Sequence, residues 1–291
     1  MELARLLPLV LQASIAAIVA SIAMGARLSD LSGLWERPGL LLRSLLAMFV
    51  VMPVVAVGIA VLFDLARMVE VALIALALSP VPPMLPRKAA KASGTSSYML
   101  GLLFAASLLS VAYVPLAAHL LGRIFHRPFH VDAFVVGRII AVSVLLPLLA
   151  GFMLRLWLPS LADRLPKPLS AVATVLLALA AAPILVKEWP QVTALVSNLG
   201  VVVIAGFVIV GLGVGHLLGG PDPDERTALA LATASRHPAI ALAILHEAPD
   251  PGAALAAVLL VLLAGAVLSV PYVKWRSAGH AKRHAPGEGR A

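Results

Sequence analysis

Long apolar stretches dominate this chain and restrict what it can fold into. A helix needs about 20 consecutive apolar residues to cross the hydrocarbon core of a bilayer. About nine stretches of this length occur, at residues 4–25, 39–62, 68–92, 96–121, 132–156, 168–186, 196–218, 226–246 and 252–275. The alternating segments of about ten residues that a membrane β-barrel requires are absent. The sequence therefore predicts an all-α polytopic membrane protein with about nine transmembrane helices.

The loops between these stretches leave no room for a separate soluble domain. We expect one transmembrane domain over residues 1–275 and a basic, disordered cytoplasmic tail over residues 276–291. Only 12% of the residues are charged, about half the share of a soluble domain. The chain has no cysteine, which excludes disulfides, thiolate metal sites and cysteine nucleophiles. No cofactor motif and no metal-ligand cluster is present.

The basic residues indicate the orientation of the chain. The net charge of +8 comes from Lys and Arg in alternate loops, and cytoplasmic loops of membrane proteins carry this excess. The richer side holds Arg27, Arg37, Lys88, Lys91, Arg155, Arg164, Lys167, Arg226, Lys274, Arg276, Lys282 and Arg283. We therefore expect a multi-pass protein of the inner (plasma) membrane, with the N-terminus outside and the C-terminus in the cytoplasm. We expect the protein to contact the lipid bilayer and not to bind nucleic acid.

Two of the apolar stretches are interrupted. Prolines within "SPVPPMLPRK" break the third span, and "SRHP" breaks the eighth, because proline removes a backbone donor and clashes with the preceding turn. The helix-breaking positions are Pro82, Pro83, Pro86 and Pro238. Broken backbone at membrane depth is tolerated where it is buried in protein or lines a wet cavity. The alternative is that both interruptions are loops, but 226–235 and 238–246 are each too short to cross a bilayer alone.

The positions of the two breaks predict an inverted repeat. An offset of five spans makes the third and the eighth run in opposite directions, so spans 1–4 pair with spans 6–9 and span 5 stays unpaired. Interrupted hydrophobic segments at matching positions of two halves point to the midplane site of a secondary transporter. We expect the two broken helices to cross at that site.

The candidate substrate-binding residues lie at the second break: Arg236, His237, Ser235 and Thr233. None of the fourteen acidic residues is near the centre of a predicted span, whereas Arg236 is. A charge at the bilayer centre costs at least about 2.5–3.5 kcal/mol, so its presence indicates a role. Arginine binds carboxylates in a bidentate manner, which favours an organic anion as substrate. The alternative is that Arg236 donates to carbonyls freed in the third span, and the two roles are compatible.

The other polar residues near the breaks allow two interpretations each. We expect His237 to be a neutral hydrogen-bonding group, although a histidine can also carry a coupling proton. Lys88 and Arg87 each fit either a cytoplasmic flank or the cavity, and for Lys88 we favour the flank. Thr95 and Ser96 offer oxygen ligands, but "SGTSS" also reads as a helix-capping turn.

Two segments resemble the bile acid:sodium symporter family. They are "LQASIAAIVASIAMGARLSDLSGLWERPGLLLRSLLAMFVVMPVVAV", which resembles that family's opening, and "ATASRHPAIALAI", which is similar to its second crossing helix. The resemblance implies a panel domain over about 4–25, 132–156 and 168–186, and a core domain over about 39–121 and 196–275. It also implies alternating access by rocking of the core against the panel, with organic anions and sodium as cargo.

The same resemblance shows where this chain departs from the family. The family's sodium-binding glutamate falls on Ala232, its glutamine on Arg236 and its asparagine on His237. Its first crossing motif falls on Val81 to Pro86, and the glutamine of an "AQFxxMP" motif becomes Met48, which we count as a candidate cavity residue with Arg87. Two hydroxyls of the family's sodium site fall near Met99 and Leu103. We therefore expect degenerate sodium sites in an organic-anion carrier, with Arg236 in the place of the cation.

Other functions remain open from sequence alone. The carrier could be a sodium symporter that uses backbone ligands, or it could be proton-coupled. An intramembrane enzyme is disfavoured because the chain lacks zinc and nucleophile-elbow motifs. Adjacent positions on a helix do not face one another, so Ser235 and His237 make a poor dyad. A channel would show flux that does not saturate, and a scaffold would show none.

Overall fold

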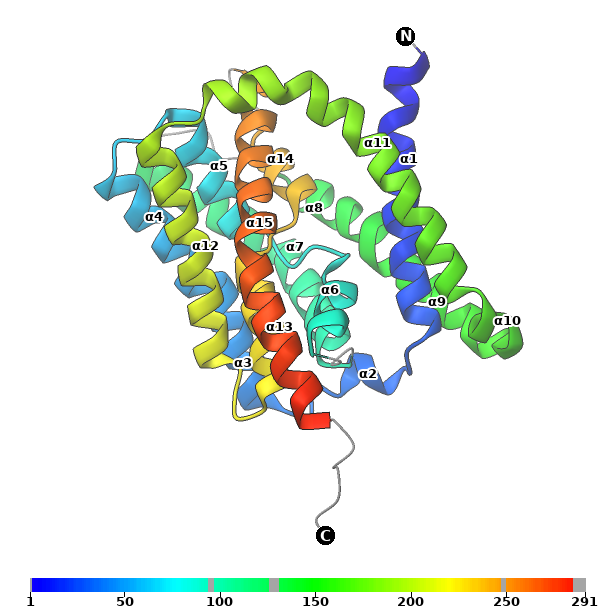
Figure 1. The fold of residues 1–291 in the computed structure, drawn as a ribbon. Coiled ribbons are helices and arrows are strands. Elements are labelled where there is room, and N and C mark those ends of the chain that lie inside the picture. The colour runs from blue at the N-terminus through cyan, green and yellow to red at the C-terminus, as the bar shows by residue number, and fades with distance from the viewer. Residues whose placement is uncertain (1, 94–96, 126–130, 247–249, 285–291) are drawn as a thin grey trace.

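The computed structural model describes residues 2–93, 97–125, 131–246 and 250–284. Within these ranges every regular element is helical. Seven helical segments are long and apolar enough to cross a membrane, so the prediction of an all-α polytopic membrane protein is confirmed. α1 begins at one end of the bundle and α15 ends at the other (Figure 1), which fits an odd number of crossings. The count of nine itself stays a prediction.

The seven long segments follow the predicted spans closely. They are α1 (Glu2–Met24), α3–η1–α4 (Pro38–Leu46, Ala47–Val51, Met52–Leu62), α7 (Ser97–Phe125), α8–η2–α9 (Ala133–Ile140, Ala141–Leu145, Leu146–Trp157), α11 (Pro166–Ala194), α12 (Asn198–Leu218) and α15 (Pro251–His284). The π-turns η1 and η2 each lie just before a proline, Pro53 and Pro147. Proline lacks the N–H that an α-helical bond needs, and the wider turn accommodates its ring.

Both interrupted stretches are pairs of short helices. The third is α5 (Arg67–Leu78) and α6 (Leu85–Ser93), and the eighth is α13 (Pro223–Ala234) and α14 (Pro238–Ile244). Pro82 and Pro83 lie in the first break, and Pro238 starts α14. Pro86 was wrongly placed in the break. It lies in the first turn of α6, where a missing N–H costs no helical bond.

Two further short helices complete the chain. They are α2 (Ser29–Ser32) and α10 (Pro159–Arg164). α1 packs along α9 and α11, which are the helices of the expected panel. The half-helices on either side of the two breaks pack with one another and with α12 and α15, on the other side of the molecule (Figure 1). The division into a moving core and panel stays a prediction.

The tail was expected to be disordered, and for its first part this is wrong. α15 continues to His284, and its end is fastened to the start of α13. Arg276 Nε donates to Thr227 Oγ1 at 2.7 Å, and Arg276 Nη2 donates to the Pro223 carbonyl at 2.5 Å. His280 lies 3.2 Å from Asp224. Polar anchors on α13 therefore prolong the helix beyond its apolar stretch.

An ion pair fixes the start of α13 on its other side. Glu225 is 4% exposed, and Arg37 binds its carboxylate through both terminal nitrogens. The hydrogen bond to Glu225 is the main reason why the pKa of Arg37 is raised above its ordinary value. The pair keeps Arg37 charged and compensates the buried carboxylate, so α13 enters the bundle at a defined position.

The second half-helix pair is held by close packing between α12 and α13. A Cβ at Gly215 would lie 2.5 Å from Ala230 Cα and 2.5 Å from the Leu229 carbonyl oxygen. Small residues let membrane helices approach this closely. Thr233 uses the approach, since its hydroxyl lies 2.5 Å from the Gly211 carbonyl oxygen of α12.

Gly215→Ala should therefore destabilise the protein by about 1–3 kcal/mol, because backbone atoms of α13 cannot move aside. Gly213→Ala is the matched control on the same helix, since a Cβ there meets nothing within 4 Å. The melting temperature in detergent should fall for Gly215→Ala and stay level or rise for Gly213→Ala. Equal effects of the two substitutions would show that the α12–α13 approach is not tight.

Candidate functional site

The two breaks meet each other in the middle of the structure. The His237 backbone N–H donates to the Pro80 carbonyl oxygen at 3.0 Å. Arg236 Nη1 donates to the Ser79 carbonyl oxygen at 3.3 Å. α5 ends at Leu78 and α13 ends at Ala234, so backbone groups in the two breaks have no hydrogen-bond partner within their own helices. Each break therefore supplies hydrogen-bond partners to the other. The expected crossing of the two broken helices is present in the structure.

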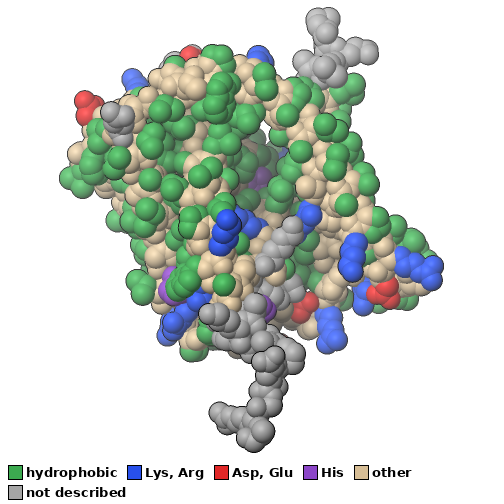
Figure 2. Space-filling view, in the orientation of Figure 1, with side chains coloured by type: hydrophobic (Ala, Val, Ile, Leu, Met, Phe, Trp, Pro, Cys, Tyr) green, Lys and Arg blue, Asp and Glu red, His purple; other side chains and the backbone are tan. Residues whose placement is uncertain are grey.

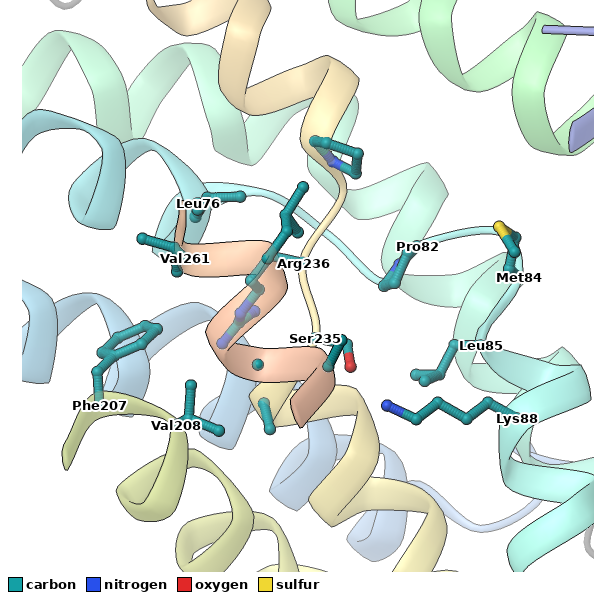
Figure 3. A pocket seen from close by; sticks show the side chains of 15 residues that line it. Leu76, Pro82, Met84, Leu85, Lys88, Phe207, Val208, Ser235, Arg236 and Val261 are labelled. Atoms are coloured by element: carbon teal, nitrogen blue, oxygen red, sulfur yellow. The ribbon is translucent and has the colours of Figure 1, made fainter. Parts of the chain in front are cut away.

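A cavity of about 300 Å³ lies beside this crossing. Its walls come from the first break and α6, from the second break, and from α12 and α15 (Figure 3). Its described lining residues are Leu76, Pro82, Met84, Leu85, Lys88, Phe207, Val208, Ala234, Ser235, Arg236, Pro238, Val261, Leu262, Gly265 and Ala266. Most are apolar, two are cations, and none is acidic. This composition suits a small anion with an apolar part.

Arg236 is the most unusual group of the cavity. It is 3% exposed, and its Nε and Nη2 have no hydrogen-bond partner in the described part of the chain. The single contact to Ser79 therefore uses one of its five N–H donors. Buried polar groups are normally paired, so the unpartnered nitrogens of Arg236 mark it as a candidate binding group. The predicted bond to a carbonyl of the first break is therefore present, and Arg236 also lines the cavity; its contact with a substrate stays a prediction.

Ser235 and Lys88 also line the cavity. Lys88 reaches in from α6, and its nitrogen points toward Ser235 (Figure 3). The sequence favours a cytoplasmic flank over the cavity for Lys88, and the structure places its side chain at the cavity wall; the membrane side on which it lies stays a prediction. Because α6 folds back toward α15, Lys88 Nζ donates to Ser269 Oγ at 2.7 Å. The loop between the half-helices decides this placement, and no local sequence signal marks it.

Two of the predicted substrate-binding residues lie outside the cavity lining. Thr233 is buried against Gly211 of α12, as described above, and has a packing role. His237 is 3% exposed, and its Nε2 lies 3.3 Å from Ser143 Oγ of η2. The ring of His237 therefore points toward the α8–η2–α9 segment, away from the anion-sized space beside Arg236.

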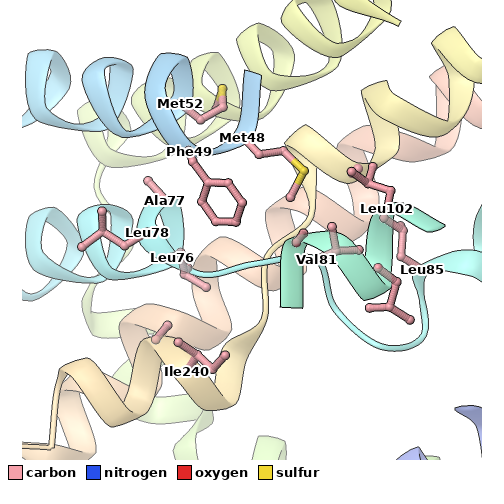
Figure 4. Packing of buried hydrophobic residues seen from close by; sticks show 14 of the residues in the cluster. Met48, Phe49, Met52, Leu76, Ala77, Leu78, Val81, Leu85, Leu102 and Ile240 are labelled. Carbon is pink, nitrogen blue, oxygen red and sulfur yellow. The ribbon is translucent and has the colours of Figure 1, made fainter. Parts of the chain in front are cut away.

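The remaining candidate cavity residues are also placed elsewhere. Met48 is fully buried with Phe49, Met52 and Val81 in the apolar cluster (Figure 4). Its thioether fills core space and does not reach the cavity. Thr95 and Ser96 lie outside the described residues.

Arg87 belongs to a different place as well. It donates to Thr174 Oγ1 of α11, and its Nη1 lies 3.4 Å from the Ser170 carbonyl oxygen. It lines a second cavity, of about 350 Å³, between α1, α6 and α11. Arg87 therefore connects the first broken helix to a helix of the expected panel.

The family comparison agrees with this architecture. The model of the sodium bile acid symporter family matches residues 14–195, which is more than half of the chain. The chain belongs to this family. A search of curated proteins found no match. Membership confirms the resemblance seen in the sequence, and it makes this symporter-family protein a membrane transporter.

The matched region ends at the C-terminus of α11, before the second break. The positions on which the sequence comparison led us to expect the family's polar residues, Ala232, Met48, Met99 and Leu103, all have 0% exposure. None carries a side-chain oxygen, which sodium needs as a hard cation. Among the described residues no group of three His, Asp or Glu side chains could hold a metal ion. The guanidinium of Arg236 lies at the crossing, against the Ser79 carbonyl.

A single thiol can report the charge of the cavity, because the chain has no cysteine of its own. The measured quantity is the ratio of the reaction rate with anionic methanethiosulfonate ethylsulfonate to the rate with its cationic trimethylammonium counterpart. This ratio should be about tenfold or more higher in Ser235→Cys than in the exposed control Ser29→Cys. Cationic clefts of this kind raise anion encounter rates by about 10–1,000-fold. A rate ratio equal to that of Ser29→Cys would show that Arg236 and Lys88 do not make the cavity electropositive.

Proposed function

We propose that this protein is a secondary transporter of a small organic anion, such as a carboxylate, and that Arg236 binds the anion. The observation that carries the proposal is the buried guanidinium with two unpartnered nitrogens at the cavity wall. A carboxylate accepts two parallel N–H bonds from such a group. The cavity of about 300 Å³ lies at the low end of small-molecule sites, which favours a compact substrate over a large steroid.

Arg236 also supplies a positive charge at the place where the family uses sodium. A guanidinium stays protonated in proteins, so the charge is permanent and is not released with the substrate. We infer that transport is independent of sodium, as a uniport, an exchange or a proton-coupled process. Sodium-coupled symport through backbone oxygens is the alternative, and family membership favours it.

Alternating access gives the contacts between the expected core and panel a role. Arg87 binds α11, and His237 contacts η2. Both contacts cross between the broken helices and the expected panel segments, so rocking of the core would break them. The carrier would then expose the cavity to one side of the membrane at a time, and substrate release would precede the return step.

The distribution of charge supports the expected orientation. In the view of Figure 2, most of the visible Lys and Arg side chains lie toward the end of the molecule where α15 terminates. Positive residues accumulate on the cytoplasmic side of membrane proteins. We therefore keep the proposal of a plasma-membrane protein with its C-terminus in the cytoplasm.

Arg236→Met should abolish saturable uptake of a substrate anion into proteoliposomes, because it removes the charge but keeps an apolar stem. Radiolabelled adipate and taurocholate serve as probes of small and large size. The variant should remain folded, since Arg236 makes a single hydrogen bond to the first break. Arg67→Met, at the start of α5, controls for the loss of one positive charge elsewhere.

Uptake by Arg236→Met at the wild-type rate would refute the role of Arg236. Loss of uptake together with a collapsed melting transition would mean that the residue acts through structure alone. Retained melting and lost uptake is the expected combination.

A further inference from the structure

The cavity holds two cationic groups from different elements. Arg236 comes from the second break, and Lys88 comes from α6. In Figure 3 they enter from different sides, with Ser235 between them in the view, and Arg236 extends toward Phe207 and Val208. The other described lining side chains are apolar. An anion bound at Arg236 therefore shares its cavity with a second positive charge.

Lys88 is held in position without being neutralised. Its ammonium donates to Ser269 Oγ, and the Ser269 hydroxyl in turn donates to the Gly265 carbonyl oxygen at 2.7 Å. This chain fixes the ammonium against α15. An ammonium has three N–H donors, and Lys88 has no ion-pair partner in the described part of the chain. Two of its donors thus remain for a ligand.

Two unneutralised cations in one apolar cavity restrict the charge of the occupant. A buried charge without a counter-charge is costly, and like charges in a low-dielectric space repel each other. A monoanion at Arg236 would leave Lys88 uncompensated. An occupant with two anionic groups would compensate both cations, and its connecting segment would lie against Leu76, Val261 and Leu262.

We propose that Lys88 is a specificity-determining residue that binds a second anionic group, so that the substrate is a dianion with two acidic groups joined by a short apolar chain. The proposal rests on the proposed function, since it takes Arg236 as the first anion site. The planar guanidinium suits a carboxylate that binds in a bidentate manner. The lysine, a flexible point charge, accepts a carboxylate or a sulfonate in a less restricted geometry.

Matched acids test this substrate class. The melting temperature of the purified full-length protein is measured with the linear dicarboxylates from succinate to suberate, and with monocarboxylates of the same chain lengths from butanoate to octanoate. At least one dicarboxylate should bind about tenfold or more tightly than its monocarboxylate, because a second charge-assisted contact forms. The series covers the range of spacings between the two acidic groups.

Two variants separate the roles of the cations. Lys88→Met should remove the preference for the dicarboxylate and change monocarboxylate affinity less than about twofold. Lys88→Arg keeps the charge and should retain part of the preference. Lys274→Met, an exposed lysine on α15, should leave both affinities unchanged. Arg236→Met should weaken the binding of both acids.

The outcomes distinguish this inference from the proposed function. Equal affinity of wild-type protein for both acids, or equal losses in Lys88→Met, would overturn the second site while leaving anion binding at Arg236 intact. Binding of neither series to the wild-type protein, or binding that survives in Arg236→Met, would overturn the proposed function and this inference with it. A dicarboxylate preference that is lost in Lys88→Met and kept in the control Lys274→Met would support both.

Discussion

The structure depends on backbone satisfaction at the point where the two broken helices cross. Lipid offers no hydrogen bonds, so an interrupted helix in a membrane must find partners inside the protein. Here the His237 amide and the Arg236 guanidinium donate to the carbonyls of Pro80 and Ser79. Each break thus stabilises the other, and helices α12 and α15 enclose both.

The same crossing decides the electrostatics of the site. Ala232, Met48, Met99 and Leu103, where we expect polar residues of the family to fall, are buried and apolar, so their side chains supply no oxygen ligands. Arg236 adds a fixed positive charge, and Lys88 adds a second one. We propose that a cavity lined in this way favours anions over sodium. Family membership shows a transporter, and the charge of its cavity supports our proposal of an organic anion as its cargo.

Sequence reasoning predicted the architecture better than the site. Helix boundaries and both breaks follow from hydrophobic length and from proline, which are local properties. Arg236 and Ser235 were found because a charge inside an apolar span is conspicuous. The cavity position of Lys88 is not predictable from local sequence, since the path of the chain from Ser79 to Met84 decides where α6 points. The packing of Thr233 and Met48 depends on α12 and on the core cluster, which are not local to them either. The inverted repeat remains a prediction.

The claim that Arg236 replaces sodium has a direct test. The melting temperature of the detergent-purified protein is compared in sodium, potassium and choline chloride at matched ionic strength. An ion present at a hundred times its dissociation constant stabilises the native state by about 2.7 kcal/mol, which shifts the melt by several degrees. We predict the same melting temperature in all three salts. A rise specific to sodium would show that backbone oxygens retain the family's cation site, and it would contradict the account.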